Sequence, residues 1–237
     1  RKRLLEFDDV MNAQREIVYK RRRNALFGER LKVDIANMMY DLADFITDNN
    51  KATNNYKNFE FELITTFAIG APMSQDEFAR MSSQEIIDKV YETATRVYRE
   101  KNDRNARNAY PVIKDVIENQ GDRFERIVIP FTDGQKTLSV VTNLKSAFET
   151  QGHSVIDEFE KNITLALLDE AWKKHLRKMD ELKQSVQLAV HEQKDPLLIY
   201  KFEAFNLFKR TLNDLNKELA SFIFRADLPE APKNNEE

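Results

Sequence analysis

Apolar residues recur every three or four positions along most of this chain, and that spacing places side chains on one face of an α-helix. The longest such pattern runs over 4–48 without a proline. It predicts one helix of about 45 residues, about 65 Å long at 1.5 Å per residue. Gly28 is the position at which this helix would bend or break, because glycine weakens a helix interior. A helix of this length is typical of a strut between domains.

A second helical region contains two apolar seams separated by a polar loop. The first seam comprises Leu168, Trp172, His175, Met179, Leu182 and Val186. The second comprises Leu198, Phe202, Phe205, Phe208, Leu212, Leu215, Leu219 and Phe222. Pro196 separates them, because proline lacks an amide hydrogen and disfavours helical geometry in the residue before it. The seams predict a helical hairpin packed through Trp172, His175, Met179, Phe202 and Phe205, with an exposed tip near 188–195.

The segment between these regions contains shorter elements. Helices are predicted over 56–69, 75–81, 84–107, 111–121 and 144–150. Ser74 with Glu77 and Ser82 with Glu85 have the spacing of capping boxes. Two β-branched runs, 126–131 and 136–141, flank a turn that contains Gly134 and therefore predict one β-hairpin, with Pro130 on an edge strand. The expected fold class is thus mostly α with one β-hairpin.

Composition supports long solvated helices rather than sheet. Hydrophobic residues make up 41% of the chain and charged residues 32%, with 5 glycines and 6 prolines in 237 residues. The net charge of -3 argues against a general polyanion-binding protein. The absence of cysteine excludes disulfides, thiolate ligands and cysteine nucleophiles in this sequence. No apolar run is long enough to span a bilayer. The chain begins with Arg1 rather than Met, so we interpret it as part of a larger protein.

Candidate catalytic chemistry is sparse. The 5 glycines are too widely spaced to form a phosphate loop, so a nucleotide site is not expected here. The 3 histidines are isolated, and no metal-binding spacing occurs. His175 could act in catalysis, but its place on an apolar face favours a buried histidine hydrogen-bonded to a neighbour. Asp8 and Asp9 are adjacent, and adjacent helical residues point about 100° apart, which disfavours a paired carboxylate site. No catalytic residue, metal or cofactor is therefore expected in this chain.

Two blocks of sequence resemble one family. The first block comprises Trp172-Lys173-Lys174-His175-Leu176, Met179-Asp180, Leu182-Lys183-Gln184-Ser185-Val186, Gln193-Lys194-Asp195-Pro196, Tyr200-Lys201 and Glu203-Ala204-Phe205. The second comprises Leu4-Leu5-Glu6-Phe7-Asp8-Asp9-Val10-Met11-Asn12 with Gln14-Arg15. These blocks resemble the two-helix finger and the start of the scaffold helix of SecA, the ATP-driven motor family of bacterial preprotein translocation.

The resemblance implies a domain organisation. It assigns 1–50 to a helical scaffold, 51–152 to a helical wing domain, 153–226 to the continued scaffold with its finger, and 227–237 to a linker. It also implies that ATP and Mg²⁺ bind to absent domains of a parent ATPase. The parent would act in the bacterial cytoplasm, peripherally at the inner membrane, with the SecYEG channel and unfolded preprotein as partners. Exposed scaffold faces would favour a dimer.

The resemblance also implies roles for individual residues. The finger tip, which would contact the channel and the moving polypeptide, comprises Leu188, Val190, His191, Glu192, Gln193 and Lys194. Relatives often carry a tyrosine where this chain has His191, whose ring becomes charged below about pH 6.5. Asp8, Asp9 and Arg15 would contact the nucleotide-binding domains and transmit their movement. The alternative for the tip is a solvated turn without a special contact.

One other function class remains open from sequence. Amphipathic periodicity alone also fits a free-standing coiled-coil interaction module. The basic run Lys20–Arg23 would then suggest nucleic-acid binding, although a solvated helical face fits the many nearby acids better. We therefore expect no nucleic-acid partner.

Overall fold

The structure, a computed structural model, describes residues 2–28, 30–121, 123–188 and 195–229. In chain order its elements are α1 (Lys2–Phe27), α2 (Leu31–Lys51), α3 (Tyr56–Phe67), α4 (Gln75–Arg80), α5 (Ser83–Gln120), β1 (Arg126–Thr132), β2 (Thr137–Asn143), α6 (Leu144–Glu149), α7 (His153–Leu188) and α8 (Pro196–Arg225). The strands form one antiparallel pair. The predicted fold class, mostly α, is confirmed.

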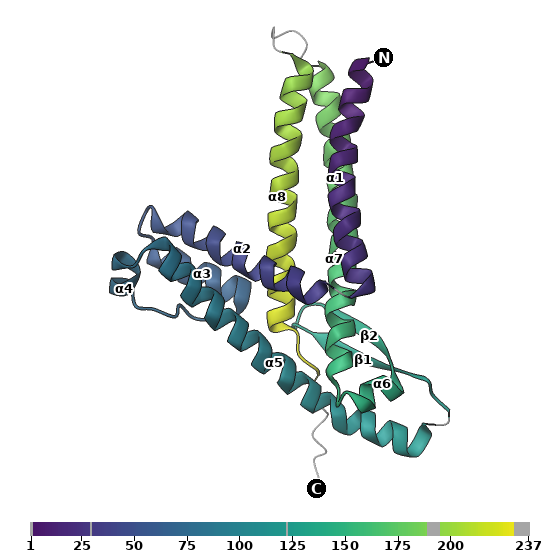
Figure 1. The fold of residues 1–237 in the computed structure, drawn as a ribbon. Coiled ribbons are helices and arrows are strands. Elements are labelled where there is room, and N and C mark those ends of the chain that lie inside the picture. Colours follow the sequence, from purple (N-terminus) through teal and green to yellow (C-terminus); the bar gives the residue numbers. More distant parts are fainter. Residues whose placement is uncertain (1, 29, 122, 189–194, 230–237) are drawn as a thin grey trace.

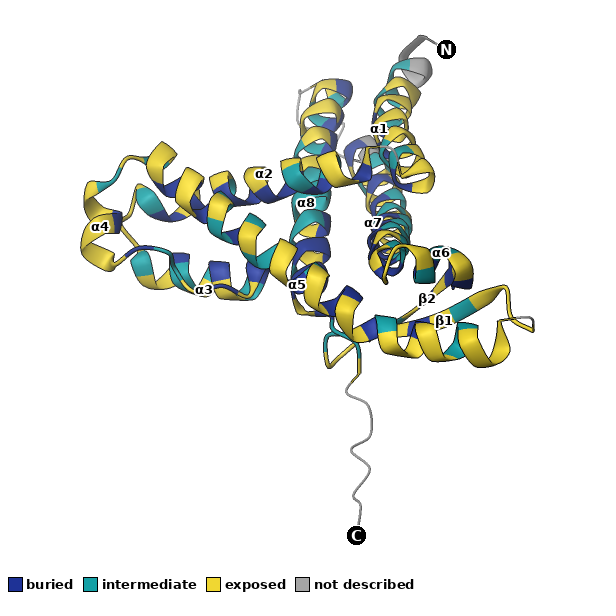
Figure 2. Cartoon of the chain, turned by 60° about the horizontal axis from the view of Figure 1, so that its bottom comes forward, coloured by how far each residue is buried: buried dark blue, intermediate teal, exposed yellow. Residues whose placement is uncertain are grey.

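Three helices form an upright stalk, and the others spread from its base. Figure 1 shows α1, the later part of α7 and α8 side by side, with α2, α3, α4 and the first part of α5 extending to one side. α5 continues past the base of the stalk toward α6 and the β-hairpin, which lie beside the start of α7. The main hydrophobic core lies where these parts meet, as the buried faces in Figure 2 show. The stalk has a small second core of its own, centred on Met179, Val186, Tyr200 and Ala204. The long α7–α8 hairpin is therefore anchored mainly at its base.

The predicted single helix of about 45 residues is wrong, and the break considered at Gly28 is confirmed. This residue has φ +73°, the left-handed conformation that glycine adopts at helix ends without steric cost. α2 then leaves at a steep angle to α1 and packs mainly against α5. Residues 31–51 thus lie with the wing helices rather than along the stalk. The local preference of glycine was a weak signal, and tertiary packing of α2 decided the break.

A second predicted break does not occur. α5 runs continuously through Pro111, so the two helices predicted over 84–107 and 111–121 are one. Proline removes one intrahelical hydrogen bond. Buried Ala106, Ala109 and Ile113 on both sides hold the helix against its neighbours and offset that loss. The capping box at the start of α5 is confirmed by the Ser82 amide, which donates to Glu85 Oε2 at 2.8 Å.

The β-hairpin is confirmed. Its strands pair from Arg126 with Asn143 to Thr132 with Thr137, and Gly134 in the turn has φ +89°. The sheet has two strands, so β1 with Pro130 is an edge strand, as predicted, while α6 and α7 lie along β2. Ile129 and Phe131 face the core. The ring of Phe131 stacks on Phe159 of α7 at 4.3 Å between centroids.

The linker begins later than predicted. Asp227 forms a β-bridge with Thr132, with both backbone hydrogen bonds at 2.9 Å, so it belongs to the fold. Residues 230–237, the rest of the predicted linker, lie outside the described residues.

Candidate functional site in the three-helix stalk

A hydrogen-bonded chain of buried polar groups joins the three stalk helices. His175 of α7 is fully buried, at 0% exposure. Its Nε2 lies 2.8 Å from Gln14 Oε1 of α1, and its Nδ1 lies 3.1 Å from Thr211 Oγ1 of α8. Gln14 Nε2 in turn donates to the backbone oxygen of Ala204 at 3.1 Å. α1 and α7 each contribute one residue and α8 contributes two, and the connection fixes the relative rotation of the three helices.

The same contacts assign the tautomer of His175. Because the amide nitrogen of Gln14 donates to Ala204, its oxygen faces the imidazole and can only accept. His175 Nε2 then donates to this oxygen, and Nδ1 accepts from the hydroxyl of Thr211, which also lies 2.9 Å from the backbone oxygen of Leu207. Burial, with a smaller contribution from Lys178, lowers the pKa of His175 to about 4. The imidazole is therefore neutral at pH 7, and the sequence-based interpretation of a buried, hydrogen-bonded histidine is confirmed.

Two of the other predicted packing residues occupy buried or half-buried positions. Trp172 is half-buried, and its ring lies over His175 at 5.5 Å and 27°. Met179 is 2% exposed and belongs to the stalk core. Tyr200 joins that core from α8 and meets Phe7 of α1 at 4.7 Å between ring centroids. Packing within the hairpin therefore extends to α1.

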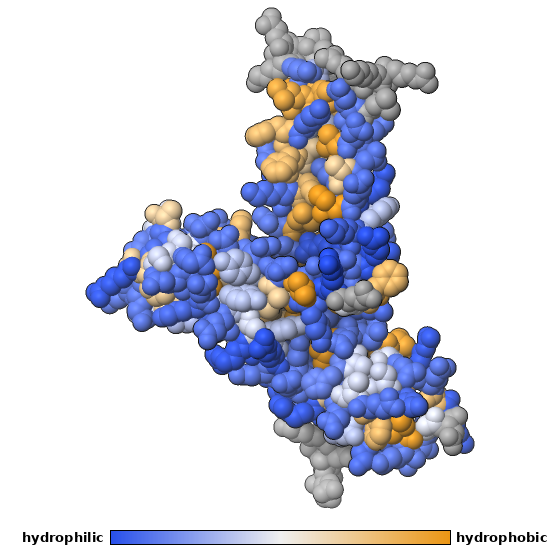
Figure 3. Space-filling view, in the orientation of Figure 1, coloured by the Kyte–Doolittle hydropathy of each residue, from blue (hydrophilic) through white to orange (hydrophobic). Residues whose placement is uncertain are grey.

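Phe202 and Phe205 are not packing residues, contrary to the prediction. Their side chains are 64% and 65% exposed. The inward face of α8 is instead formed by Leu197, Tyr200, Ala204, Phe208 and Leu215. Both lines of residues have helical spacing and share Phe208 and Leu215, so periodicity alone could not select between them. Figure 3 shows apolar side chains gathered along the stalk.

The residues predicted to contact motor domains lie on the early part of α1. Asp8, Asp9 and Arg15 are all exposed. Asp8 forms an ion pair with Lys183 of α7 at 3.7 Å, and Arg15 donates to Asn12 at 3.0 Å. Asp8 and Arg15 thus each have a contact within the stalk, while both side chains remain exposed.

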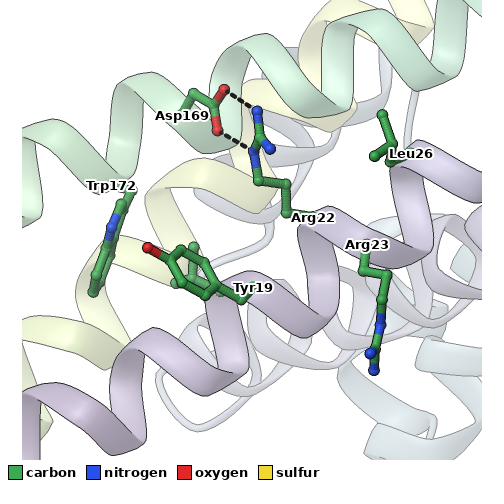
Figure 4. A pocket seen from close by; sticks show the side chains of 7 residues that line it. Tyr19, Arg22, Arg23, Leu26, Asp169 and Trp172 are labelled. Carbon is green, nitrogen blue, oxygen red and sulfur yellow. Dashed lines mark hydrogen bonds and ion pairs between the residues drawn. The ribbon is translucent and has the colours of Figure 1, made fainter.

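A groove runs between the later part of α1 and α7. It has a volume of about 410 Å³ and is lined by Val18, Tyr19, Arg22, Arg23, Leu26, Asp169 and Trp172. Figure 4 shows the guanidinium of Arg22 against the carboxylate of Asp169, with hydrogen bonds of 2.9 and 3.1 Å. Arg21 is bound to Asn216 of α8. Half of the basic run 20–23 is therefore committed to contacts within the protein.

The finger tip falls largely outside the described part of the chain. α7 ends at Leu188, and α8 begins at Pro196, where Asp195 accepts a hydrogen bond from the amide of Leu197 at 3.0 Å. The predicted tip residues Val190, His191, Glu192, Gln193 and Lys194 lie outside the described residues. The structure thus places the two helix ends that bracket the tip.

Sequence analysis missed the partners of His175. Gln14 interrupts the apolar spacing of Met11 and Val18 at an inward-facing position, which was the available signal. No group of three or more metal-binding side chains occurs within the described ranges. Likewise, none of the described helices is both long and apolar enough to cross a membrane.

Comparison with known proteins agrees with this architecture. The family described as "SecA Wing and Scaffold domain" matches residues 1–227. The chain is 62% identical to the protein translocase subunit SecA of Flavobacterium psychrophilum and 45% identical to that of Parabacteroides distasonis, in each case over all of this chain and 21% of the relative. The SecA of Christiangramia forsetii is 62% identical over 97% of this chain and 20% of its own length. The chain spans about a fifth of the relatives it matches, and it belongs to the SecA family as a wing and scaffold region.

Proposed function

We propose that this chain is the mechanical part of a SecA-type motor, which couples ATP hydrolysis on other domains to movement of unfolded preprotein through the SecYEG channel. The observation that carries this proposal is the long α7–α8 hairpin, held to α1 by the buried Gln14–His175–Thr211 connection. A hairpin fixed in rotation at several heights can transmit a push from its base to its tip. The chain itself has no catalytic role, and ATP with Mg²⁺ binds elsewhere in the parent protein.

Specific residues have proposed roles in this mechanism. Asp8, Asp9 and Arg15 contact the nucleotide-binding domains, because all three are exposed on the helix that packs against both arms of the hairpin. The tip residues from Leu188 to Lys194 contact the channel or the moving polypeptide. The parent works in the bacterial cytoplasm and associates peripherally with the inner membrane, and it can form a dimer.

Crosslinking in the full-length motor tests this proposal. The printed sequence has no cysteine, so a cysteine-free parent with His191→Cys gives a single reporter at the tip. We expect ATP-dependent crosslinks from this position to a stalled preprotein or to the channel. Glu92→Cys, at an exposed position on α5, is the matched control and should give none. Absence of tip crosslinks in a variant that still translocates would reject the tip contact. ATP hydrolysis by the purified 237-residue chain would reject its non-catalytic role.

A nucleic-acid-binding module is the less favoured alternative. Arg21 and Arg22 are engaged by Asn216 and Asp169, which leaves Lys20 and Arg23 of the basic run to meet a phosphate backbone. Two such contacts give only a weak dependence of binding on salt. Tight, strongly salt-dependent binding to DNA or RNA would favour this alternative.

A further inference from the structure

The last turn of α8 is held by the wing on two sides. On one side Lys101 of α5 donates to the backbone oxygen of Ala226, and its Nζ lies 3.4 Å from Asp227. On the other side the β-hairpin pairs with Asp227 through Thr132. We call the set Lys101, Thr132, Lys136, Glu218 and Asp227 the base clamp.

Lys101 is an unusual component because its charge is buried. Its side chain is 5% exposed, and burial lowers its pKa while the carboxylate of Asp227 raises it. Arg104 on the same helix also reaches Asp227, at 3.2 Å. Replacing a buried ion pair with apolar residues of similar size is often neutral for stability, so we assign Lys101 a role in position rather than in stability. Here the geometry defines where α8 ends relative to α5.

The hairpin adds the second contact. Lys136 in the turn forms an ion pair with Glu218 of α8 at 2.5 Å. Phe131 stacks on Phe159 of α7, whose ring lies 6.0 Å from that of Phe222 on α8. The β-hairpin therefore touches the bases of both finger helices, α7 through Phe131 and α8 through Lys136, which gives it a role that its sequence did not indicate.

Because α8 is long, a small change of angle at its base produces a large displacement at its far end. α8 has 30 residues, so it is about 45 Å long at 1.5 Å per residue. A tilt of about 5° at its base would move its far end by about 4 Å at that length. Among the described residues, the far end packs in the small stalk core, whereas the base lies in the main core. Orientation of the finger is thus set chiefly at the base.

We propose that the base clamp is a set of positioning residues through which the wing domain sets the angle of the two-helix finger. This inference rests on the proposed motor function for its consequence in transport, but the positional claim is independent of it. Loss of Lys101 should leave ATP hydrolysis intact and reduce the preprotein moved per ATP, because the tip no longer meets its target at a fixed angle.

Distance measurement in the full-length protein tests the positional claim. Spin labels on cysteines replacing Glu92 of α5 and Lys201 of α8 report the wing-to-finger distance. We expect Lys101→Met to shift or broaden this distance distribution by several Å, about the displacement worked out above for a small tilt. Lys114→Met is the matched control, since Lys114 pairs with Glu118 on the surface of the same helix. A Lys101→Met distribution equal to that of the control would overturn the proposal.

Two further experiments distinguish loss of the clamp from general structural damage and from failure of the proposed motor function. Lys136→Glu and Glu218→Lys should each shift the distance, and the two together should restore it; failure of this rescue in folded variants would count against the clamp. Transport per ATP should fall at least threefold in Lys101→Met. A shifted distance with unchanged transport would overturn the coupling role. If the unmutated protein moves no preprotein, the motor function fails while the distance results still decide the clamp.

Discussion

Replacing Gln14 with leucine isolates the connection that joins the stalk helices. Gln14→Leu removes the acceptor of His175 Nε2–H, which is fully buried and has its other contact at Thr211. It also removes the donor to Ala204. A buried donor left without a partner costs about 1–3 kcal/mol. For a domain of this size, a loss of about 2 kcal/mol lowers the melting temperature by about 4–8 °C.

The chain contains a built-in reporter for this change. Its 1 tryptophan, Trp172, lies over His175, so urea unfolding followed by tryptophan fluorescence reads the stalk directly. Gln184→Leu, at an exposed position of α7 in the stalk, is the matched control and should stay within about 0.5 kcal/mol. The double variant Gln14→Leu with His175→Phe removes both polar partners. It should recover most of the loss, because no buried donor remains at position 175. A single Gln14→Leu variant as stable as the control would refute the assigned tautomer and the connection itself.

Three further outcomes follow from particular residues. Gly28→Ala should cost about 1–2 kcal/mol in urea unfolding from its left-handed backbone alone, because nothing lies within 4 Å of the added Cβ; Gly70→Ala, equally uncrowded and without positive φ, should be neutral. Phe205→Ser should change stability by less than about 0.5 kcal/mol while Met179→Ala costs about 2–5 kcal/mol, and equal losses by calorimetry would restore the predicted packing face. The lowered pKa of His175, about 4 against about 6.5 unfolded, means that the unfolded state takes up the proton first as pH falls. Stability should therefore decline between those values, by up to about 3 kcal/mol, and His175→Phe should lack this decline.

The β-hairpin and the capping boxes were predictable because their signals are local. Each depends on a few adjacent residues, such as the turn containing Gly134 or the Ser82–Glu85 pair, whose preferences tertiary contacts reinforce. Sequence singled out Gly28 as a bend or a break without deciding between the two, and it did not predict the continuity through Pro111. At both positions the local preference is worth only a few kcal/mol. Packing of α2 on α5 and burial around Ile113 decide the outcome.

The stalk shows a different limit. Periodicity correctly predicted that the 167–208 region forms two facing helices, and it correctly placed His175 and Met179 inside. It failed for Phe202 and Phe205 because single apolar side chains are common on protein surfaces. The presence of a phenylalanine in a helix therefore does not show which face of the helix it occupies. The partners of His175 are 161 and 36 residues away in the chain. Contacts of that separation are set by how three helices pack, which no local pattern encodes.

Glu160 provides the sharpest test of how the wing joins the scaffold. This residue of α7 is 1% exposed, and its Oε1 accepts hydrogen bonds from Tyr98 and, at 3.0 Å, from Asn102 of α5. Its Oε2 is buried, and no partner occurs among the described residues. Burial raises the pKa of Glu160 to about 7, so the native protein holds a proton that the unfolded chain, with a pKa near 4.5, releases. Stability from this group is therefore fully present below pH 4.5 and is lost as pH rises through about 7.

Glu160→Gln should copy the protonated acid, because its amide oxygen can still accept from Tyr98 and Asn102. The free-energy difference between wild type and Glu160→Gln should then depend on pH. Relative to the variant, the free energy of unfolding of the wild type should rise by about 3 kcal/mol on going from pH 8 to pH 4.5, because the pKa of Glu160 differs between the folded and unfolded states. Urea unfolding at both pH values measures this difference, and Glu158→Gln on the adjacent surface controls for removal of a carboxylate. This dependence on pH is opposite to that of His175. As pH falls from about 6.5 to 4.5, Glu160 should therefore add stability where α7 meets α5, while His175 should reduce the stability of the stalk. A pH-independent difference would mean that Glu160 is ionised in the native protein and that Lys32, which favours its charged form, balances its charge.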